Sequence, residues 1–503
     1  MSINKRTFFC MAFLFFLIPG LAPRLEPRSD ESQIASSRPQ KNNHTVIGVI
    51  DRGIDWKNPC FMSRAGNESR IAYLWDQNGT TDTPANNDIP YGVEYLKSEI
   101  QASLNSPCNF IPIEAGHGWL IAPIAAGNVT IRDERNNKLF LGKPIDMPII
   151  MVNTTGKMDA LLDAIAYILR RARQMKSKCV INFSYCKHVG SHDSDDTYIR
   201  AIDALMDEDS IFVVAAGNEG LKNIYTRNEL CPDTGFEFEI NRNKYVTEEA
   251  TSPCKIEIEI WGPPLSRISL ISPQQKTFGP VGYGDNYTFD SSEGIISISN
   301  GVSGREKKRG AVITMASHGG KSPSNGKWKI VPENNSKNQN QMIESWITRS
   351  ETSDTQFIAK GKPVNTISFL AFSQRAISVG AFQHEEGNKL KEANFSNNPC
   401  KTFHCQTPIP DVLAAGRVSV SLPGFNDPMP QEGTSVATAL ITRFIAQTWD
   451  DNPGLKGSDF KKKLNGKVMT FGADSYQWNG LPCYRMGALS LFTDSPQKQK
   501  EHQ

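Results

Sequence analysis

Largely apolar runs alternate with amphipathic stretches in the first half of the chain. Three runs are typical of strands buried on both faces, and they are residues 45–50, 179–185 and 211–216. Between them, residues 157–174 and 193–208 place apolar side chains at helical spacing. Strands that alternate with helices need crossover connections. This pattern predicts an α/β fold, a parallel sheet flanked by helices.

The pattern changes after residue 220, where apolar and polar residues alternate at every second position. Two of these stretches are Phe236/Phe238/Ile240 and Ile256/Ile258/Ile260. Short alternating runs bounded by Pro and Gly are typical of antiparallel sheets. We therefore expect an inserted antiparallel β-sandwich, jelly-roll-like, over residues 225–360. Strand and helix patterns return afterwards, so the α/β part is expected to comprise residues 45–224 and 361–494.

The longest apolar run opens the chain and suggests export. Lys5 and Arg6 precede the mostly apolar residues 8–18, and small residues follow. This run is too short to span a bilayer comfortably, and its flanks predict a signal peptide over residues 1–22. An uncleaved anchor is the alternative. We expect a flexible leader over 23–44, a disordered tail over 495–503 and no membrane span in the mature chain. The compartment would be extracellular, periplasmic or the cell surface.

Charge and cysteine usage narrow the function classes. The 503 residues include 55 Lys+Arg and 53 Asp+Glu, a net charge of +2. This balance excludes nucleic-acid binding as the main function. Ten cysteines occur, and proximity favours disulfides between Cys400 and Cys405 and between Cys231 and Cys254. No C-x-x-C pair, calcium-loop pattern or phosphate-binding Gly-rich loop is present, so we expect no metal and no cofactor.

Three segments carry the residue types that nucleophilic catalysis requires. Asp51 ends the first predicted strand, His117 lies between two glycines, and Ser435 begins a predicted helix. A Ser hydroxyl needs a base, and the resulting imidazolium needs an oriented carboxylate. Asn218 follows the third predicted strand and offers an amide for an oxyanion. Each residue alone has an ordinary structural alternative, such as a helix cap or a hydrogen-bonded loop histidine.

Taken in order, the segments resemble the subtilases, the subtilisin-like serine proteases. TVIGVIDRGID, GHGWLIAPIAAGN, VINFSY, FVVAAGNEG and EGTSVATAL are similar to the family's aspartate, histidine, substrate-strand, oxyanion and nucleophile motifs. The resemblance covers residues 45–220 and 365–492. Within the family the chain looks most like Csp-type bacterial subtilases with a β-rich insertion. The resemblance implies that Asp51, His117 and Ser435 are catalytic and that Asn218 is the oxyanion donor.

By this resemblance the chain is a serine endopeptidase that acts on protein or peptide substrates through a Ser acyl-enzyme. An extended peptide would add as a strand onto two substrate-binding segments. Their residues are Ser184, Tyr185, Cys186, Ala216 and Gly217.

Three departures from the family pattern leave other functions open. Arg52 follows the aspartate where Ser or Thr is usual, Trp119-Leu120 replaces Thr-His after His-Gly, and Cys186 replaces a Gly. These changes favour the alternative of a degenerate subtilase, a pseudoprotease that mainly binds peptides or proteins. A third alternative gives the main role to the inserted β-sandwich, as an adhesion or carbohydrate module with its own partner contacts.

Overall fold

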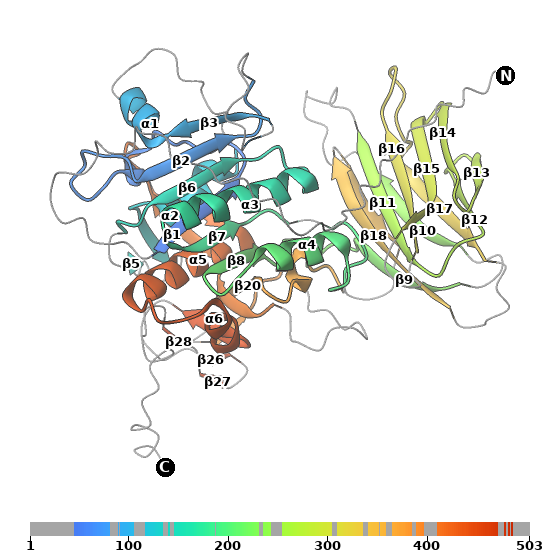
Figure 1. Cartoon of the computed structure of the whole chain (residues 1–503). Helices are drawn as coiled ribbons and strands as arrows, with labels where there is room; N and C mark the ends of the chain where they lie inside the picture. Colours follow the sequence, from blue (N-terminus) through green and yellow to red (C-terminus); the bar gives the residue numbers. More distant parts are fainter. Residues whose placement is uncertain are drawn as a thin grey trace, which may run out of the picture. The chain divides into compact units, whose positions relative to one another are not determined.

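The described part of the chain contains a large sheet with helices on both faces, the two antiparallel sheets of a β-sandwich and a small fourth sheet (Figure 1). The computed structural model describes residues 45–80, 89, 91–104, 116–133, 139–140, 145–186, 188–230, 235–242, 254–303, 309–334, 341–351, 353–358, 365–384, 389–396, 410–470, 477–478, 481–482 and 484–485. No helix in these ranges is long and apolar enough to cross a bilayer.

The large sheet is parallel at its centre. The strand order is β27-β26-β21-β20-β8-β7-β1-β6-β2-β3, with β22 beside β20, β25 beside β22 and β28 beside β25. Neighbours from β20 to β2 run parallel, whereas β3 and β21 pair antiparallel. The strands are β1 (Thr45–Asp51), β2 (Ile71–Asp76), β3 (Val93–Leu96), β6 (Ile149–Asn153), β7 (Lys178–Phe183), β8 (Ser210–Ala215), β20 (Ile377–His384), β21 (Lys389–Glu392), β22 (Val412–Ala415), β25 (Lys467–Thr470), β26 (Gln477–Trp478), β27 (Leu481–Pro482) and β28 (Tyr484–Arg485).

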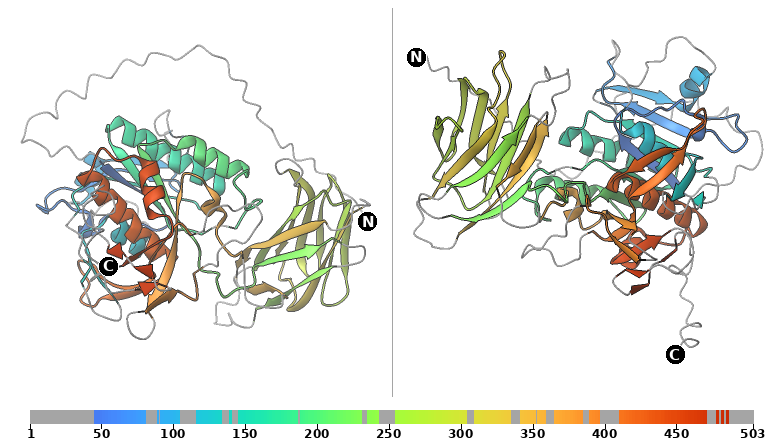
Figure 2. Two further views of the ribbon diagram at one scale, coloured as in Figure 1. Left: turned by 90° about the horizontal axis from the view of Figure 1, so that it is seen from below. Right: turned by 180° about the vertical axis from the view of Figure 1, so that it is seen from behind.

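Two apolar cores lie on opposite faces of this sheet. Successive side chains of a strand point to opposite faces, so Ile47 and Val49 of β1 pack with helices α2 and α5, and Val46 and Ile50 pack with α3 and α4. Figure 2 shows these two sets of helices around the sheet. The helices are α1 (Lys97–Leu104), α2 (Gly118–Ala126), α3 (Met158–Gln174), α4 (Thr197–Leu205), α5 (Thr434–Asp451) and α6 (Gly457–Leu464), with 3-10 turns η2 (Pro59–Phe61) and η4 (Phe369–Phe372).

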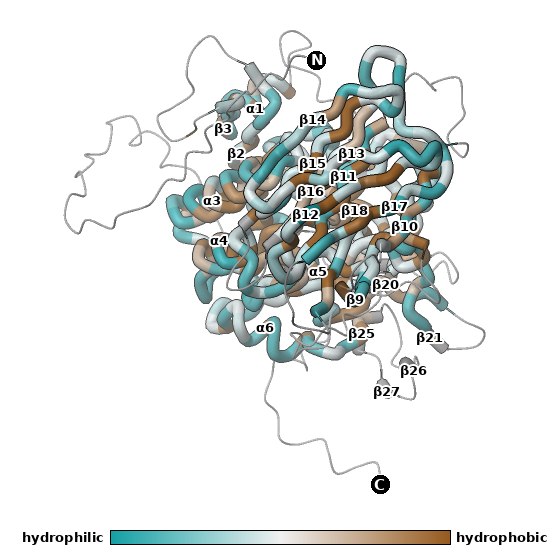
Figure 3. Tube along the Cα trace, turned by 90° about the vertical axis from the view of Figure 1, so that its right-hand side faces the viewer, coloured by the Kyte–Doolittle hydropathy of each residue, from teal (hydrophilic) through white to brown (hydrophobic). Residues whose placement is uncertain are grey.

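Strands β9 to β19 form a β-sandwich between Tyr225 and Phe357. One sheet has the order β14-β15-β16-β11-β18-β9 and the other β13-β12-β17-β10-β19, and both contribute to one apolar core. Along β10 buried Phe and Ile alternate with exposed Glu and Asn (Figure 3). The strands are β9 (Tyr225–Glu229), β10 (Phe236–Asn241), β11 (Lys255–Gly262), β12 (Arg267–Ile271), β13 (Thr277–Gly282), β14 (Asn286–Ser291), β15 (Gly294–Ser303), β16 (Arg309–Ala316), β17 (Gly326–Glu333), β18 (Met342–Glu351) and β19 (Asp354–Phe357).

A small fourth sheet completes the described elements. Its order is β24-β23-β4-β5. Its strands are β4 (Thr130–Asp133), β5 (Leu139–Phe140), β23 (Arg417–Ser421) and β24 (Met429–Glu432).

The predicted fold class is confirmed, with local differences. Strand β6 pairs directly with β1 but was not among the predicted strands. Helix α4 begins at Thr197 rather than near 193, because the Asp196 side chain accepts a hydrogen bond from the Tyr198 N–H and caps the helix there. The expected bridge between Cys231 and Cys254 involves Cys231, which lies outside the described residues. The expected signal peptide, leader, tail and Cys400–Cys405 bridge lie outside the described residues.

Candidate active site

Asp51 is fixed at the carboxyl end of β1. The residue is 1% exposed, and Oδ1 accepts a hydrogen bond of 2.7 Å from the Arg52 N–H. The turn that follows is held by Asn153 at the end of neighbouring β6, because Asn153 Oδ1 accepts the Gly53 N–H at 2.9 Å. Asn153 Nδ2 in turn donates to Asp76 Oδ1 at 2.9 Å. Three parallel strand ends thus set the position of one carboxylate.

His117 reaches this carboxylate from the start of α2. A Cβ atom at Gly118 would lie 2.9 Å from Asp51 Cβ, and one at Gly116 would lie 2.6 Å from Arg52 O. The two glycines therefore permit the close approach of the His117 backbone to the β1 end. His117 Nδ1 lies 2.9 and 3.0 Å from the two carboxylate oxygens of Asp51. An ionised carboxylate only accepts, so Nδ1 carries the proton and Nε2 is left as an acceptor.

The charge state of His117 depends on two opposing effects. Burial of the imidazole lowers its pKa, but the hydrogen bond to Asp51 and the negative charge of Asp51 raise it by more. The pKa of His117 is therefore raised above its ordinary value. A base with a raised pKa has a higher proton affinity, which suits it to receive a hydroxyl proton.

Ser435 lies in the first turn of α5, opposite His117. Ser435 is 6% exposed, and its Oγ atom lies 3.0 Å from His117 Nε2. Oγ also lies 2.9 Å from the backbone oxygen of Ser184. One hydroxyl has a single proton, so it donates either to the imidazole or to the carbonyl. Gly433 precedes the helix with a φ of 142°, a backbone conformation that favours glycine.

Asn218 is oriented by the residue before Ser435. Its Oδ1 accepts hydrogen bonds from the Thr434 N–H at 2.8 Å and from Thr434 Oγ1 at 3.0 Å. Since the oxygen end of the amide is occupied, Nδ2 is the end that remains to donate. The Ser435 N–H belongs to the first turn of α5, where backbone N–H groups have no intrahelical acceptor. The site therefore offers two donors beside the Ser435 hydroxyl.

A buried polar chain ties the segment after β7 to α5. Thr442 Oγ1 donates to Asn182 Oδ1 at 3.1 Å, and Asn182 Nδ2 donates to Ser184 Oγ at 2.9 Å. Asn182 and Thr442 are fully buried. These bonds hold Ser184 against Ser435, with Tyr185 and Cys186 following it at intermediate exposure.

Ala216 was expected to offer its backbone as an edge onto which a peptide adds as a strand, and the structure differs from this expectation. Its N–H donates to Val379 O at 2.9 Å, and its oxygen accepts the Ser368 N–H at 2.9 Å. The backbone of Ala216 is thus used within the fold, and this residue is not an open edge. Gly217 has a φ of 110°, and its N–H donates to Thr434 Oγ1 at 3.2 Å.

The two bulky departures from the family pattern are accommodated in the structure. The Arg52 side chain is exposed, and its contact with Asp51 is made by the backbone N–H. The Trp119 ring packs edge-on against Phe425 with centroids 5.2 Å apart, beside the core under α2. Neither side chain displaces an atom of the Asp51, His117 and Ser435 cluster.

The residues that hold Asp51, Ser435 and Asn218 in place were not predicted from the sequence. Asn153, Thr434 and Asn182 carry no motif of their own, and their role follows from contacts across 77 to 260 positions. The available signal is position: Asn153 ends an apolar run, and Thr434 adjoins Ser435.

The parallel sheet and this cluster define a serine protease fold. The sequence profile of the subtilase family matches residues 42–477, so the chain belongs to the subtilase family. Membership in a protease family implies a protein substrate.

One solved structure agrees with this fold, and two others are reported beside it. The CspB protease of Clostridium perfringens is similar to this chain, with a TM-score of 0.64 and 20% identity over 84% of this chain and 88% of that one. Sphericase has a TM-score of 0.40 with 13% identity over 85% and 83%. MycP1 with its N-terminal propeptide removed has a TM-score of 0.37 with 13% identity over 92% and 94%. No curated protein sequence matches the chain.

Proposed function

We propose that the chain is an exported serine endopeptidase that cleaves peptide bonds through an acyl-enzyme on Ser435. The observation that carries this proposal is the continuous contact from Asp51 through His117 to Ser435, with Nε2 and Oγ 3.0 Å apart. A nucleophile, a base and a group that orients the base are the minimum for acyl transfer. We assign these roles to Ser435, His117 and Asp51.

In the first half of the proposed reaction, Ser435 Oγ attacks the carbonyl carbon of the scissile bond and its proton moves to His117 Nε2. Asp51 stabilises the imidazolium that results. The carbonyl oxygen becomes an oxyanion and accepts hydrogen bonds from Asn218 Nδ2 and the Ser435 N–H. Collapse of the tetrahedral intermediate breaks the C–N bond. The proton on Nε2 passes to the leaving amine, which leaves an ester on Oγ.

In the second half, water takes the place of the amine. His117 Nε2 accepts a proton from the water as its oxygen attacks the ester carbon, and the same two donors hold the new oxyanion. Collapse breaks the C–Oγ bond, and Nε2 returns the proton to Ser435. The enzyme is regenerated and the products are a carboxylic acid and an amine. No cofactor enters this sequence.

A fluorophosphonate probe tests the nucleophile directly. The probe phosphonylates a Ser that is activated by a base, so wild type should be labelled stoichiometrically and Ser435→Ala should not. Ser299→Ala, in strand β15 of the sandwich, is the matched control and should label like wild type. Mass spectrometry of the labelled peptide identifies the site. Absence of labelling in a folded wild-type protein would reject the acyl-enzyme proposal.

A pseudoprotease is the second candidate, and one observation favours it. The Ser435 hydroxyl lies 2.9 Å from Ser184 O, as near as it lies to His117. A proton donated to that carbonyl leaves Oγ without its base. A pseudoprotease would bind peptides, as measured by fluorescence anisotropy. The same wild-type protein would neither react with the fluorophosphonate probe nor cleave the peptides. Labelling of wild type that is lost in Ser435→Ala decides for the enzyme.

Export and domain division are part of the same proposal. Residues 1–22 would act as a signal peptide, 225–360 would form an inserted domain, and 45–224 and 361–494 would form the catalytic domain. Mass spectrometry of the amino terminus of the protein from culture medium tests export. Limited proteolysis of the full chain tests the division, since cuts should cluster near residues 225 and 360. Retention of residues 1–22 in a cell-bound product would favour the anchor instead.

A further inference from the structure

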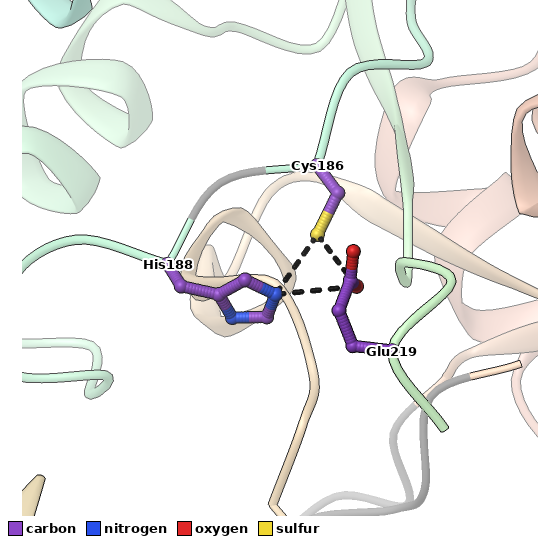
Figure 4. A group of neighbouring side chains, drawn as sticks. All are labelled: Cys186, His188 and Glu219. Atoms are coloured by element: carbon purple, nitrogen blue, oxygen red, sulfur yellow. Dashed lines mark hydrogen bonds and ion pairs between the residues drawn. The ribbon is translucent and has the colours of Figure 1, made fainter. Parts of the chain in front are cut away.

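A second group of reactive side chains lies beside the residues assigned to catalysis. Cys186, His188 and Glu219 converge so that Cys186 Sγ lies 3.3 Å from His188 Nε2 and 3.6 Å from Glu219 Oε2 (Figure 4). His188 Nε2 lies 3.3 Å from Glu219 Oε2. Three different donor atoms thus face one point. We propose that these residues form a zinc-binding site, which the proposed peptidase mechanism does not use.

The spacing of the donor atoms fits one tetrahedral ion. Zinc binds sulfur at about 2.3 Å and nitrogen or oxygen at about 2.0–2.2 Å, so two ligands of one tetrahedral zinc lie about 3.4–3.6 Å apart. The three distances in the structure, 3.3, 3.3 and 3.6 Å, agree with this within a few tenths of an ångström. Small shifts of the side chains, without movement of the backbone, bring the atoms to zinc geometry.

The donor set selects the metal. A thiolate, an imidazole and a carboxylate together suit zinc, whereas Ca²⁺ and Mg²⁺ prefer oxygen ligands alone. A thiolate and a carboxylate also neutralise the two charges of the ion. Three protein ligands leave a fourth position for water or another small donor, as at zinc sites that are open to solvent.

The imidazole of the proposed site is buried, and the carboxylate is partly open to solvent. The His188 side chain is 7% exposed, and Nδ1 has no hydrogen-bond partner among the described residues. Nε2 faces the Cys186 thiol and the Glu219 carboxylate, and an imidazole that carries its proton on Nδ1 presents the Nε2 lone pair to a cation between these groups. The Glu219 side chain is 25% exposed, which provides a path for an ion from solvent.

The proposed zinc site connects two segments that adjoin the residues assigned to catalysis. Cys186 is two residues after Ser184, whose oxygen contacts Ser435, and Glu219 directly follows Asn218. Glu219 Oε2 also accepts the Asn218 N–H at 2.9 Å. An ion held by Cys186, His188 and Glu219 would link the segment after β7 to the segment after β8. The Glu219 ligand lies 31 to 33 positions from the other two ligands, so no short zinc motif is present in the sequence.

Metal binding by the full chain tests the proposal without reference to peptidase activity. After chelator treatment under reducing conditions, wild type should bind one equivalent of Zn²⁺ in competition with a chromophoric chelator. Co²⁺ in its place should give visible bands of tetrahedral intensity and a thiolate charge-transfer band. Cys186→Ser, His188→Ala and Glu219→Gln should each weaken Zn²⁺ binding by at least about tenfold, since each removes one ligand. His318→Ala, in the sandwich, is the matched control and should bind like wild type.

A measurement on wild type alone guards against variants that fail to fold. Alkylation of Cys186 by iodoacetamide, followed by mass spectrometry, should slow at least about tenfold when Zn²⁺ is present, because a metal-bound thiolate is a poor nucleophile. Equal rates with and without Zn²⁺, or Zn²⁺ binding by folded Cys186→Ser as tight as in wild type, would overturn the proposal. If the protein binds Zn²⁺ at Cys186 but does not react with the fluorophosphonate, the zinc site is supported and the proposed peptidase function is rejected.

Discussion

Asn218 is held by Thr434 through both of the hydrogen-bond donors that Thr434 offers. The Asn218 Oδ1 atom accepts the backbone N–H and the hydroxyl of Thr434, and the residue after Thr434 is the proposed nucleophile. The amide that is assigned to the oxyanion and the helix that carries Ser435 are therefore one rigid unit. This relationship makes Thr434 a positioning residue, distinct in effect from Asn218 itself.

Replacement of these two residues should separate donation from positioning. Asn218→Ala removes a donor to the oxyanion and should lower kcat about 10²- to 10³-fold with little change in KM. Thr434→Val keeps the backbone N–H but loses one neutral hydrogen bond to Asn218, which should lower kcat about three- to tenfold. Thr434→Ser restores the hydroxyl and is the matched control. Steady-state kinetics on a chromogenic peptide measures each, and equal kcat for Thr434→Val and wild type would contradict the positioning role.

The pH dependence of kcat/KM should report the pKa of His117. His117 must be neutral to accept the Ser435 proton, so activity is lost as pH falls through its pKa. Asp51 raises this pKa against the effect of burial, so the acid limb of wild type should lie above the ordinary histidine range. Asp51→Asn removes the charge while burial remains. The limb should then move to lower pH, and kcat should fall about 10⁴-fold because the tautomer is no longer fixed.

The control for this experiment is a variant of Arg52, the cationic residue next to Asp51. Arg52→Ser introduces a residue usual in the family, and the Arg52 guanidinium is exposed. The acid limb should therefore shift far less than in Asp51→Asn. An acid limb that stays in place in Asp51→Asn would exclude Asp51 as the group that sets the His117 pKa.

The parts of the fold that could be predicted are those set by local pattern. Strand β1 and helix α3 have long, regular apolar patterns, and the predicted bounds agree with the observed ones to within a residue. Strand β6 was missed because its apolar run, residues 149–152, is only four residues long and shorter than the apolar runs of β1 and β8. The start of α4 was misplaced because one side chain, Asp196, decides it.

The candidate site divides in the same way. Asp51, His117 and Ser435 could be proposed because each lies in a short segment with a family-like sequence. The contacts that orient them could not, because Asn153 reaches Gly53 across 100 positions and Asn182 reaches Thr442 across 260. Such pairs depend on strand register and helix placement, which no short motif encodes. For the same reason, the hydrogen bonds that the Ala216 backbone makes within the fold could not be predicted from the sequence.

Glu259 should make stability depend on pH. This carboxyl is buried in strand β11, where it accepts the Gly190 N–H at 2.7 Å and the Trp261 Nε1–H at 2.8 Å. Burial raises its pKa to about 7, the two N–H donors act in the opposite direction, and the charges of Glu257 and Asp196 add to the increase. The folded state therefore binds the proton more tightly than the unfolded chain.

The sign follows from this difference in proton affinity. A carboxyl pKa raised from 4.5 to about 7 gives stability that is fully present below about pH 4.5 and is lost as pH rises to about 7. The loss is at most about 3 kcal/mol at about 1.4 kcal/mol per pKa unit. Glu259→Gln should remove this decline, so the thermal midpoint of the variant should gain on wild type between pH 5 and pH 8. Glu239→Gln, on an exposed position of β10, is the matched control. A parallel pH dependence of wild type and Glu259→Gln would contradict the prediction.

Two buried arginines should stabilise the carboxyl end of the helix that begins after His117. Arg70 donates to four backbone oxygens, including Ala126 O at 2.6 Å, and Arg443 donates to Gly127 O at 2.6 Å and Ile124 O at 3.4 Å. Burial lowers the pKa of both guanidinium groups to about 10, so both remain charged at neutral pH. Cations at a helix carboxyl end are favourable, and these carbonyls have no intrahelical donor.

Loss of Arg443 removes the donor to the Gly127 and Ile124 carbonyls, and loss of Arg70 removes the donor to the Ala126 and Met147 carbonyls, at about 1–3 kcal/mol each. The other two carbonyls that Arg70 contacts keep a hydrogen bond from Asn128. Arg443→Met should therefore destabilise the protein by about 2–4 kcal/mol, and Arg70→Met by more, because it removes twice as many bonds. Lysine at either position keeps the charge but not the planar set of donors, so it should recover less than half of the loss. Arg417→Met, which removes an exposed ion pair with Glu432, is the control and should cost less than about 1 kcal/mol. Differential scanning calorimetry ranks the variants, and an Arg70→Met midpoint at or above that of Arg417→Met would show that the carbonyls find other donors.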